Sequence, residues 1–320
     1  MKLGFLGTFI MLCLAEFVIA KDAPDTILIN GIVVTLAGPG NGNLAQAIAI
    51  SSNRIIAVGT TAEISNLSST QTDVIDLLGG TVLPGFIDAH GHFPSSGIID
   101  RHFVDLNSPP IGTVNSIDQL VKRLALQAAD TTKGLWIQGR GYDDTLIAEM
   151  RHPTRWDLDQ ASTDHPIYIS HISGHLAVGN SLAIEMASIT RDSPQPFGGK
   201  IRMDNTTGEP NGVLEEPPAM GQVSRLLPQF SEDDLVEAVA DAAQAYASVG
   251  VTTAQQGATG INGADIFVRA YREGRLPIRV HVWPSIQSMI QLIENGGTLE
   301  EPDVEGMVTY KAIKGFADGS

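Results

Sequence analysis

The chain has almost no cysteine, because Cys13 is the single one among 320 residues. One thiol cannot form an intramolecular disulfide, and it excludes every zinc site that needs two or more thiolates. A metal ion bound by this chain would therefore use histidine, carboxylate or lysine-derived oxygen. Basic residues are also scarce: 20 Lys and Arg face 36 Asp and Glu, and the net charge of −16 repels phosphate backbones. We expect no nucleic-acid partner.

The remaining composition is that of a folded protein. Hydrophobic residues make up 43% of the chain and charged residues 18%, which is neither a disordered nor a fibrous composition. At roughly 150 residues per domain, the length corresponds to about two domains.

Residues 1–20 predict a secretory signal peptide. Lys2 precedes an apolar run over residues 3–15, and Val18 and Ala20 occupy the small-residue positions of a cleavage site. The run is shorter than the ~20 residues that span a bilayer, which disfavours a membrane anchor. We therefore expect entry into the secretory pathway, a secreted or periplasmic location and no membrane attachment after cleavage.

Two patterns of secondary structure follow the signal. Over residues 21–82, short β runs alternate with turn residues, which predicts a small β-sandwich subdomain. After about residue 230, helices and strands alternate as βα units, and Ser231 can cap a helix whose fourth position is Asp234. Such units build a parallel sheet or a (β/α)8 (TIM) barrel.

The barrel is predicted to be incomplete, and residues 83–320 form it. The chain supplies four candidate strands, whereas a closed barrel needs eight. A long stretch over about residues 100–230 lacks the βα rhythm and is interpreted as an insertion after the first barrel strand. Ser116 can open a helix there, with Gln119 as the capping-box partner. The four candidate strands cover residues 81–87, 251–254, 278–283 and 308–314.

His90 and His92 are the first candidates for chemistry. On an extended strand, residues two apart point to the same side, so both histidines can bind one metal ion. They follow the apolar run VLPGFID, at the end of a strand where a barrel delivers functional groups.

This segment resembles the first metal-binding strand of the amidohydrolase superfamily. The stretches GLWIQGRGYDD, RHPTRWDLDQASTDHPIYISHISGHLAVGNS, GEPNGVLEE and GVTTAQQGA are similar to the branch that contains N-substituted formamide deformylases. The resemblance covers most of the chain from Asp25 onward. It implies an α/β fold, in which a metal-dependent hydrolase TIM barrel carries an N-terminal β-sandwich and a large insertion.

The resemblance also implies a third ligand. Lys314, in YKAIKGFADGS, matches a lysine that many amidohydrolases carboxylate to bridge two metal ions. An ordinary ion pair at the barrel mouth is the alternative role for Lys314. The cofactor implied is a divalent metal, zinc in the first place, as one or two ions held by His90, His92 and Lys314.

The insertion supplies two candidates for substrate binding, His175 in SGHLAVGNS and Tyr142 in GRGYDD. A structural histidine and a turn tyrosine are the alternatives for these residues. The substrate is expected to be a small molecule, and the oligomeric state is left open, a homo-oligomer included.

The implied function is metal-dependent hydrolysis of a carbon–nitrogen bond other than a peptide bond, of the amide or formamide type. The family's ligands from the fifth, sixth and eighth strands have no counterpart in the sequence, so we expect a C-terminally truncated member. Two alternatives stay open. The chain can be a catalytically inactive secreted fragment, or its family can hydrolyse another bond such as an ester.

Overall fold

The computed structural model describes residues 23–37, 44–302 and 304–315. The predicted signal peptide, residues 1–20, lies outside the described residues and stays a prediction. The chain divides into two compact units, Met1–Gly85 and Phe86–Ser320. Among the helices described, none is both long enough and apolar enough to cross a membrane.

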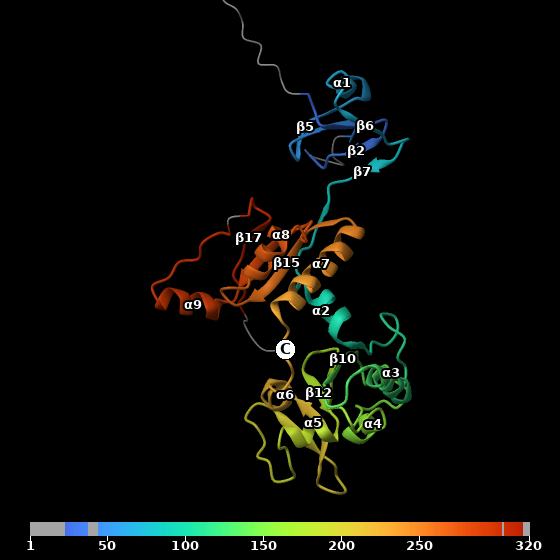
Figure 1. Ribbon diagram of the computed structural model, residues 1–320, viewed down its shortest axis with the longest axis vertical. Helices are drawn as coiled ribbons and strands as arrows, with labels where there is room; N and C mark the ends of the chain where they lie inside the picture. The colour runs from blue at the N-terminus through green and yellow to red at the C-terminus, as the bar shows by residue number, and fades with distance from the viewer. Residues whose placement is uncertain (1–22, 38–43, 303, 316–320) are drawn as a thin grey trace, which may run out of the picture. The chain divides into compact units, whose positions relative to one another are not determined.

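Two small sheets form the first unit (Figure 1). One has the strand order β5-β4-β1-β6 and the other β3-β2-β7. Alternation along β1 and β4 turns Ile27, Ala47 and Ala49 inward, where they pack with Ile64 of the short helix. The elements are β1 (Thr26–Ile29), β2 (Ile32–Val34), β3 (Leu44–Ala45), β4 (Ala47–Ser51), β5 (Arg54–Gly59), α1 (Thr61–Ser65), β6 (Asp73–Asp76) and β7 (Thr81–Val82).

The first barrel strand, predicted as one run over residues 81–87, is two strands. Residues 81–82 form β7 and pair with β2, whereas residues 86–87 form β8 in the second unit and pair with β15. Pro84 lacks the N–H that a continuous ladder requires, and Gly85 follows it. The predicted strand is therefore wrong as a single element.

Four parallel strands of the second unit form one sheet in the order β17-β16-β15-β8. Helices α7 and α8 cover one face (Figure 1), and their apolar side chains pack on Ala254, Val280, Val282 and Val308. The α/β class is confirmed, and the described residues show no closed barrel. The elements are β8 (Phe86–Ile87), α2 (Ser95–His102), α7 (Glu232–Ser248), β15 (Val251–Thr259), α8 (Asp265–Arg272), β16 (Arg279–Pro284), α9 (Ile286–Glu294) and β17 (Val308–Tyr310).

The predicted helix starts are confirmed, with one difference in detail. Ser231 caps α7 through Asp234 in a reciprocal capping box. Ser116 caps the insertion helix by accepting a hydrogen bond from the Gln119 N–H. The Gln119 side chain, however, accepts from the backbone N–H of Asn115 at 3.0 Å instead of that of Ser116.

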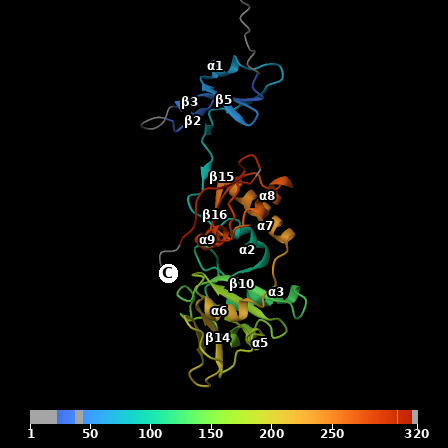
Figure 2. The ribbon, with the colours of Figure 1, turned by 90° about the vertical axis from the view of Figure 1, so that its left-hand side faces the viewer.

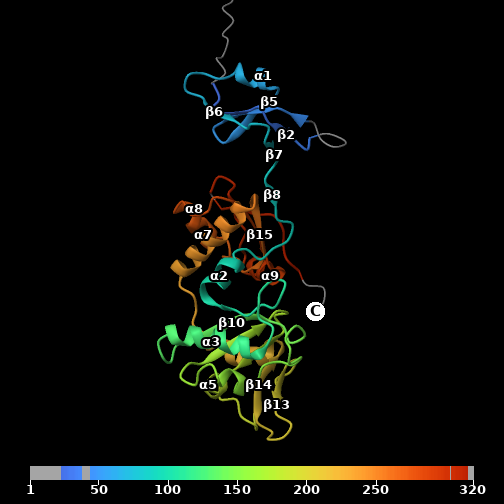
Figure 3. The same ribbon diagram turned by 90° about the vertical axis from the view of Figure 1, so that its right-hand side faces the viewer.

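The insertion is a six-stranded mixed sheet with helices on both faces (Figures 2 and 3). Its order is β13-β14-β12-β11-β10-β9, and β9, β10 and β11 are parallel. Helices α3 and α4 enclose one apolar core, and α5 and α6 enclose another on the opposite face. The elements are β9 (Val104–Asp105), α3 (Ile117–Asp130), β10 (Ile137–Tyr142), α4 (Arg155–Asp159), β11 (Ile167–His171), β12 (Leu176–Gly179), α5 (Ser181–Met186), β13 (Lys200–Met203), β14 (Pro210–Glu215) and α6 (Glu216–Ser224).

A bulge at Gly141 changes the direction of the side chains at the end of β10. The register against β11 shifts between Arg140 and Tyr142, and Gly141 has a φ of 97°. A Cβ on Gly141 would lie 2.3 Å from the side-chain oxygen of Asn107, so only glycine fits. The bulge turns Tyr142 into the core beneath α3 and α4, the face to which Ile137 points.

Asn180 joins three segments of the insertion. Its side chain is fully buried, and its Oδ1 accepts hydrogen bonds from the backbone N–H groups of Ile167 and Ala183, each at 3.0 Å. Its Nδ2 donates to the carbonyls of Ser162 and His165 at 3.1 and 2.9 Å. All four partners would lose a bond if this side chain were removed.

We expect Asn180→Ala to lower the free energy of unfolding by about 3 kcal/mol, because each buried polar group left without a partner costs about 1 to 3 kcal/mol. Urea unfolding followed by tryptophan fluorescence measures the change. The exposed Asn205 provides the control, and Asn205→Ala should leave the midpoint unchanged. A loss below about 1 kcal/mol for Asn180→Ala would contradict the assigned role.

Asp157 holds the start of α4 and the loop before it. Its carboxylate accepts from the backbone N–H of Thr154 at 2.7 Å and from Arg151 at 2.7 and 3.1 Å. Arg151 in turn donates to the carbonyl of His152 at 2.9 Å. Burial raises the pKa of Asp157, but the hydrogen bonds from Arg151 and Thr154 outweigh burial and hold this pKa below its ordinary value.

Asp157→Asn should therefore destabilise the chain by about 1.5 to 3 kcal/mol near neutral pH, where the carboxylate is charged. A depressed folded-state pKa stabilises fully above the unfolded-state value near 3.9, and this contribution is lost as pH falls through the folded-state pKa. The difference between wild type and variant should shrink as pH falls from about 4 to about 2. Urea midpoints across that range test this, with Asp130→Asn at an exposed helix end as the control. A difference that is independent of pH would contradict the expectation.

Candidate functional site

The two predicted metal-binding histidines lie in the segment that follows β8, and not on the strand itself. Strand β8 ends at Ile87, and His92 makes an isolated bridge to Gln256 of β15. Backbone hydrogen bonds tie this segment to β15: the Phe93 N–H donates to the Gln255 carbonyl at 3.0 Å. Both histidines are exposed and stand at the carboxyl ends of the parallel strands.

The rings of His90 and His92 are neighbours. Their centroids are 5.9 Å apart, with an angle of 70° between the ring planes. The indole of Trp283, at the end of β16, stands edge-on to His90 at 5.2 Å. The backbone N–H of His90 donates to Asp88 Oδ1 at 3.1 Å. The structure therefore brings His90 and His92 together and packs the His90 ring against the indole of Trp283.

The sheet face opposite α7 and α8 is polar. Because side chains alternate along β16, His281 and Trp283 point away from the core that holds Val280 and Val282. Gln255 lies beside His281, with its amide nitrogen 3.2 Å from His281 Nδ1. Burial lowers the pKa of His281, and the charges of Lys311 and Arg279 lower it further. The neutral imidazole is thus favoured on this face.

Buried polar atoms without a hydrogen-bond partner gather around the same sheet. Nine such side-chain atoms occur in the part of the chain that the structure describes, and five belong to these strands or to the segment after β8. Native interiors rarely leave such groups unsatisfied, so their concentration marks a place where a ligand, an ion or water is expected. The five atoms are Asp88 Oδ2, Gln255 Oε1, Gln256 Oε1, Trp283 Nε1 and Thr309 Oγ1.

Lys314 follows β17 at the same end of the sheet. The strand ends at Tyr310, earlier than the predicted residue 314, and pairing resumes only as a bridge between Lys314 and Ser285. The Lys314 N–H donates to the Pro284 carbonyl at 2.9 Å, next to Trp283. Its backbone is therefore fixed beside the strand that carries Trp283, and its role as a ligand stays a prediction.

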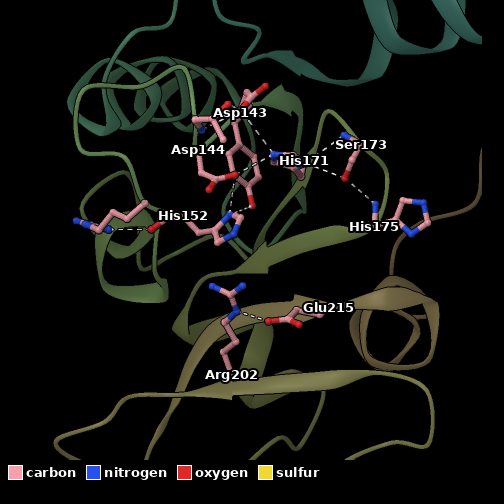
Figure 4. Close-up of polar contacts among 11 residues, drawn as sticks. Asp143, Asp144, His152, His171, Ser173, His175, Arg202 and Glu215 are labelled. Carbon is pink, nitrogen blue, oxygen red and sulfur yellow. Dashed lines mark hydrogen bonds and ion pairs between the residues drawn. The ribbon is translucent and has the colours of Figure 1, made fainter. Parts of the chain in front are cut away.

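A second polar cluster stands at the carboxyl ends of β10 and β11 in the insertion (Figure 4). His171 ends β11 opposite Tyr142 of β10, and Asp143 and Asp144 follow Tyr142. His171 Nε2 lies 3.1 Å from Asp144 Oδ1 and 4.0 Å from Asp143 Oδ1. His152, from the loop before α4, lies with its Nδ1 3.6 Å from Asp144 Oδ1.

Burial and neighbouring groups shift the pKa values of several residues in this cluster. Hydrogen bonds from Thr145 lower the pKa of Asp143 although burial opposes them, so the carboxylate is ionised. Burial lowers the pKa of His152 more than Asp144 raises it. Burial also raises the pKa of Tyr142, whose hydroxyl lies 3.3 Å from His152 Nδ1. The cluster thus combines the charged carboxylate of Asp143 with a neutral phenol and a histidine, His152, that favours its neutral form.

The two predicted substrate-binding residues do not meet in one contact. Tyr142 is fully buried, and its hydroxyl contacts His152. His175 is half-buried, and its Nδ1 lies 2.8 Å from Glu216 Oε2. In Figure 4 the His175 ring points away from Asp143 and Asp144. Neither role in substrate binding is tested by these contacts.

Of the insertion cluster, sequence reasoning singled out Tyr142 and missed Asp144, His152 and His171. One signal was available, because Asp143 and Asp144 follow the run IQGRGY and His171 ends the run IYISH. Had both runs been recognised as neighbouring parallel strands, their carboxyl ends would have been expected at one edge. His152 carries no such signal, because only the fold of its loop brings it to the cluster.

Comparisons with known proteins match most of the chain. Residues 73–320 match the model of the amidohydrolase family. The chain is similar to N-substituted formamide deformylase from Arthrobacter pascens, with 31% identity over 256 residues, which is 79% of this chain and 46% of the relative. It is also similar to the protein LONG AFTER FAR-RED 3 from Arabidopsis thaliana, with 26% identity over 92% of this chain and 50% of that protein. The chain therefore spans about half the length of these curated relatives.

A solved structure shares the fold. The crystal structure of a metal-dependent hydrolase from Pyrococcus furiosus superposes with a TM-score of 0.67 and 25% identity, covering 92% of this chain and 57% of that one. The family match extends over more than half of the chain and includes both the parallel strands and the insertion. The chain belongs to the amidohydrolase family.

Proposed function

We propose that the protein is a metal-dependent hydrolase that acts on a carbon–nitrogen bond other than a peptide bond, in a small amide or formamide. The observation that carries the proposal is the pair of exposed imidazoles of His90 and His92 at the carboxyl ends of four parallel strands. Their ring centroids lie 5.9 Å apart. Family membership supports the reaction class, and the similarity to a formamide deformylase supports the substrate class.

The residues at the strand ends fit a divalent ion. Two imidazoles with a lysine nearby in the fold, and no thiolate, suit zinc bound through nitrogen and oxygen. The Oδ2 atom of Asp88 is buried in this segment without a hydrogen-bond partner among the residues described, which leaves an oxygen for which an ion or water is expected. His90 and His92 would hold the ion, with Lys314 as a further ligand. When bound, the ion would lower the pKa of a water molecule and polarise a carbonyl.

Side chains around the histidine pair position one ligand and line the polar face of the sheet. Trp283 restricts the ring of His90 by its edge-on contact and provides an apolar wall for a substrate. The neutral His281 is held by the Gln255 amide on the polar face of the sheet, where it can donate a hydrogen bond from Nε2 without adding charge. Gln255 Oε1 and Thr309 Oγ1 are shielded from solvent and unpartnered within the described part, so an ordered water molecule is their expected partner.

Loss of a ligand should abolish most of the activity. Because losing even an outer partner of a metal site costs about 10- to 100-fold, His92→Ala and Lys314→Met should each lower kcat/KM for an N-alkyl formamide by at least about 100-fold. Steady-state assays measure this, together with zinc content and the effect of a chelator followed by added Zn²⁺. Lys122→Met, which removes an exposed helix lysine paired with Asp118, is the matched control and should keep full activity.

Several outcomes would count against the proposal. Hydrolysis that survives the chelator would exclude the metal-dependent reaction. Absence of turnover by the metal-loaded chain on every substrate would favour the inactive secreted fragment. Faster hydrolysis of the matching formate ester than of the formamide would favour the ester alternative.

A further inference from the structure

Asp143, Asp144 and His171 form a compact set of ligand atoms that the proposed hydrolytic site does not use. One ligand atom from each residue lies within 4.8 Å of the others. With bonds of about 2.0 to 2.2 Å to a divalent ion, neighbouring ligands in one coordination shell stand about 3 to 4 Å apart. The distances of 3.1 and 4.0 Å from His171 Nε2 to the two carboxylates match this spacing.

The orientation of His171 supports a shared ion. Its side chain is only 11% exposed, and its Nε2 is shielded from solvent without a hydrogen-bond partner among the residues described. The opposite ring nitrogen, Nδ1, lies 2.8 Å from the Ser173 hydroxyl. If that hydroxyl accepts the Nδ1 proton, the Nε2 lone pair faces the carboxylates, which is the arrangement of a metal-binding histidine with its outer partner.

The other neutral tautomer of His171 is the alternative to this arrangement. The backbone N–H of Ser173 lies 3.1 Å from His171 Nδ1 and can donate to it. Nε2 would then carry the proton and make a simple contact with Asp144. The two states differ in whether the chain binds a cation here, so metal binding separates them.

The charge of the cluster favours a cation. Two adjacent carboxylates, 22% and 25% exposed, have ion-pair contacts only with His152 and His171 among the residues described. The nearby Arg202 is paired with Glu215. Mostly buried carboxylates are costly unless a positive charge compensates them, and among the residues described no Lys or Arg pairs with these two.

The carboxylates are also held in place. Asp143 Oδ1 accepts from the Thr145 N–H at 2.9 Å and from its hydroxyl at 2.6 Å, which fixes the side chain. The bulge at Gly141 turns this end of β10 to the same face as His171. Figure 4 shows Asp143, Asp144 and His171 converging from the two strand ends.

We propose that the insertion binds one divalent transition-metal ion through Asp143, Asp144 and His171, independently of the histidine pair at the ends of the parallel strands. The mixture of one imidazole and two carboxylates suits Zn²⁺ or Mn²⁺ better than Mg²⁺ or Ca²⁺, which prefer oxygen ligands alone. The bound ion joins the ends of β10 and β11. This inference does not rest on the proposed hydrolytic function.

The test uses the full chain with the strand-end pair removed. His90→Ala combined with His92→Ala should keep about one bound Zn²⁺, measured by mass spectrometry of the metal content and by titration calorimetry. Adding Asp144→Asn or His171→Asn should weaken Zn²⁺ binding at least about tenfold. Asp118→Asn, which changes an exposed carboxylate on α3, is the control and should leave the affinity unchanged.

Asp144→Asn is nearly isosteric, and unchanged circular dichroism and urea midpoint of the metal-free chain would separate ligand loss from misfolding. Co²⁺ bound to the double variant should give a visible spectrum that changes with His171→Asn. If the double variant binds no Zn²⁺, or if both cluster variants bind as tightly as their parent, the proposal is wrong. Zinc retained in the insertion together with chelator-insensitive hydrolysis would reject the hydrolytic proposal alone.

Discussion

Burial of Phe93 is the interaction on which the position of both candidate metal-binding histidines depends. Phe93 follows His92 directly, is 1% exposed, and packs against Tyr246 and Phe267 at ring separations of 5.5 and 5.7 Å. Its backbone N–H is also bonded to β15. An apolar anchor on one side and a strand on the other hold an otherwise irregular segment, so two exposed polar side chains keep a defined place.

The same sheet separates stability from chemistry by the alternation of side chains along each strand. Val280 and Val282 face the helices and contribute to the core, whereas His281 and Trp283 between and after them face the other way. Substitutions on the second face can change ligand binding without opening the core. The insertion differs, because Ile167 and Ile169 pack in the core on the same face of β11 on which His171 ends the strand.

Local signals in the sequence were sufficient for the elements that depend on neighbours along the chain. The caps at Ser116 and Ser231 and the helix–strand alternation after residue 230 are encoded within a few residues, and the structure confirms them. The break between β7 and β8 was also visible at Pro84, but the apolar run on both sides concealed it. The insertion cluster was not accessible in this way, because the pairing of β10 with β11 and the loop that carries His152 are decided by tertiary packing.

Gly141 gives this cluster an unusual genetic sensitivity. Side chains in a strand alternate with a period of two, and the bulge adds one residue to β10 relative to β11. A substitution of Gly141 by a residue that cannot hold a φ of 97° would restore regular alternation with the residue count unchanged, and it would turn the following tyrosine to the opposite face of the sheet. A single-nucleotide change in the Gly141 codon would thus dismantle an arrangement that many conservative amino-acid exchanges in the same strand would leave in place.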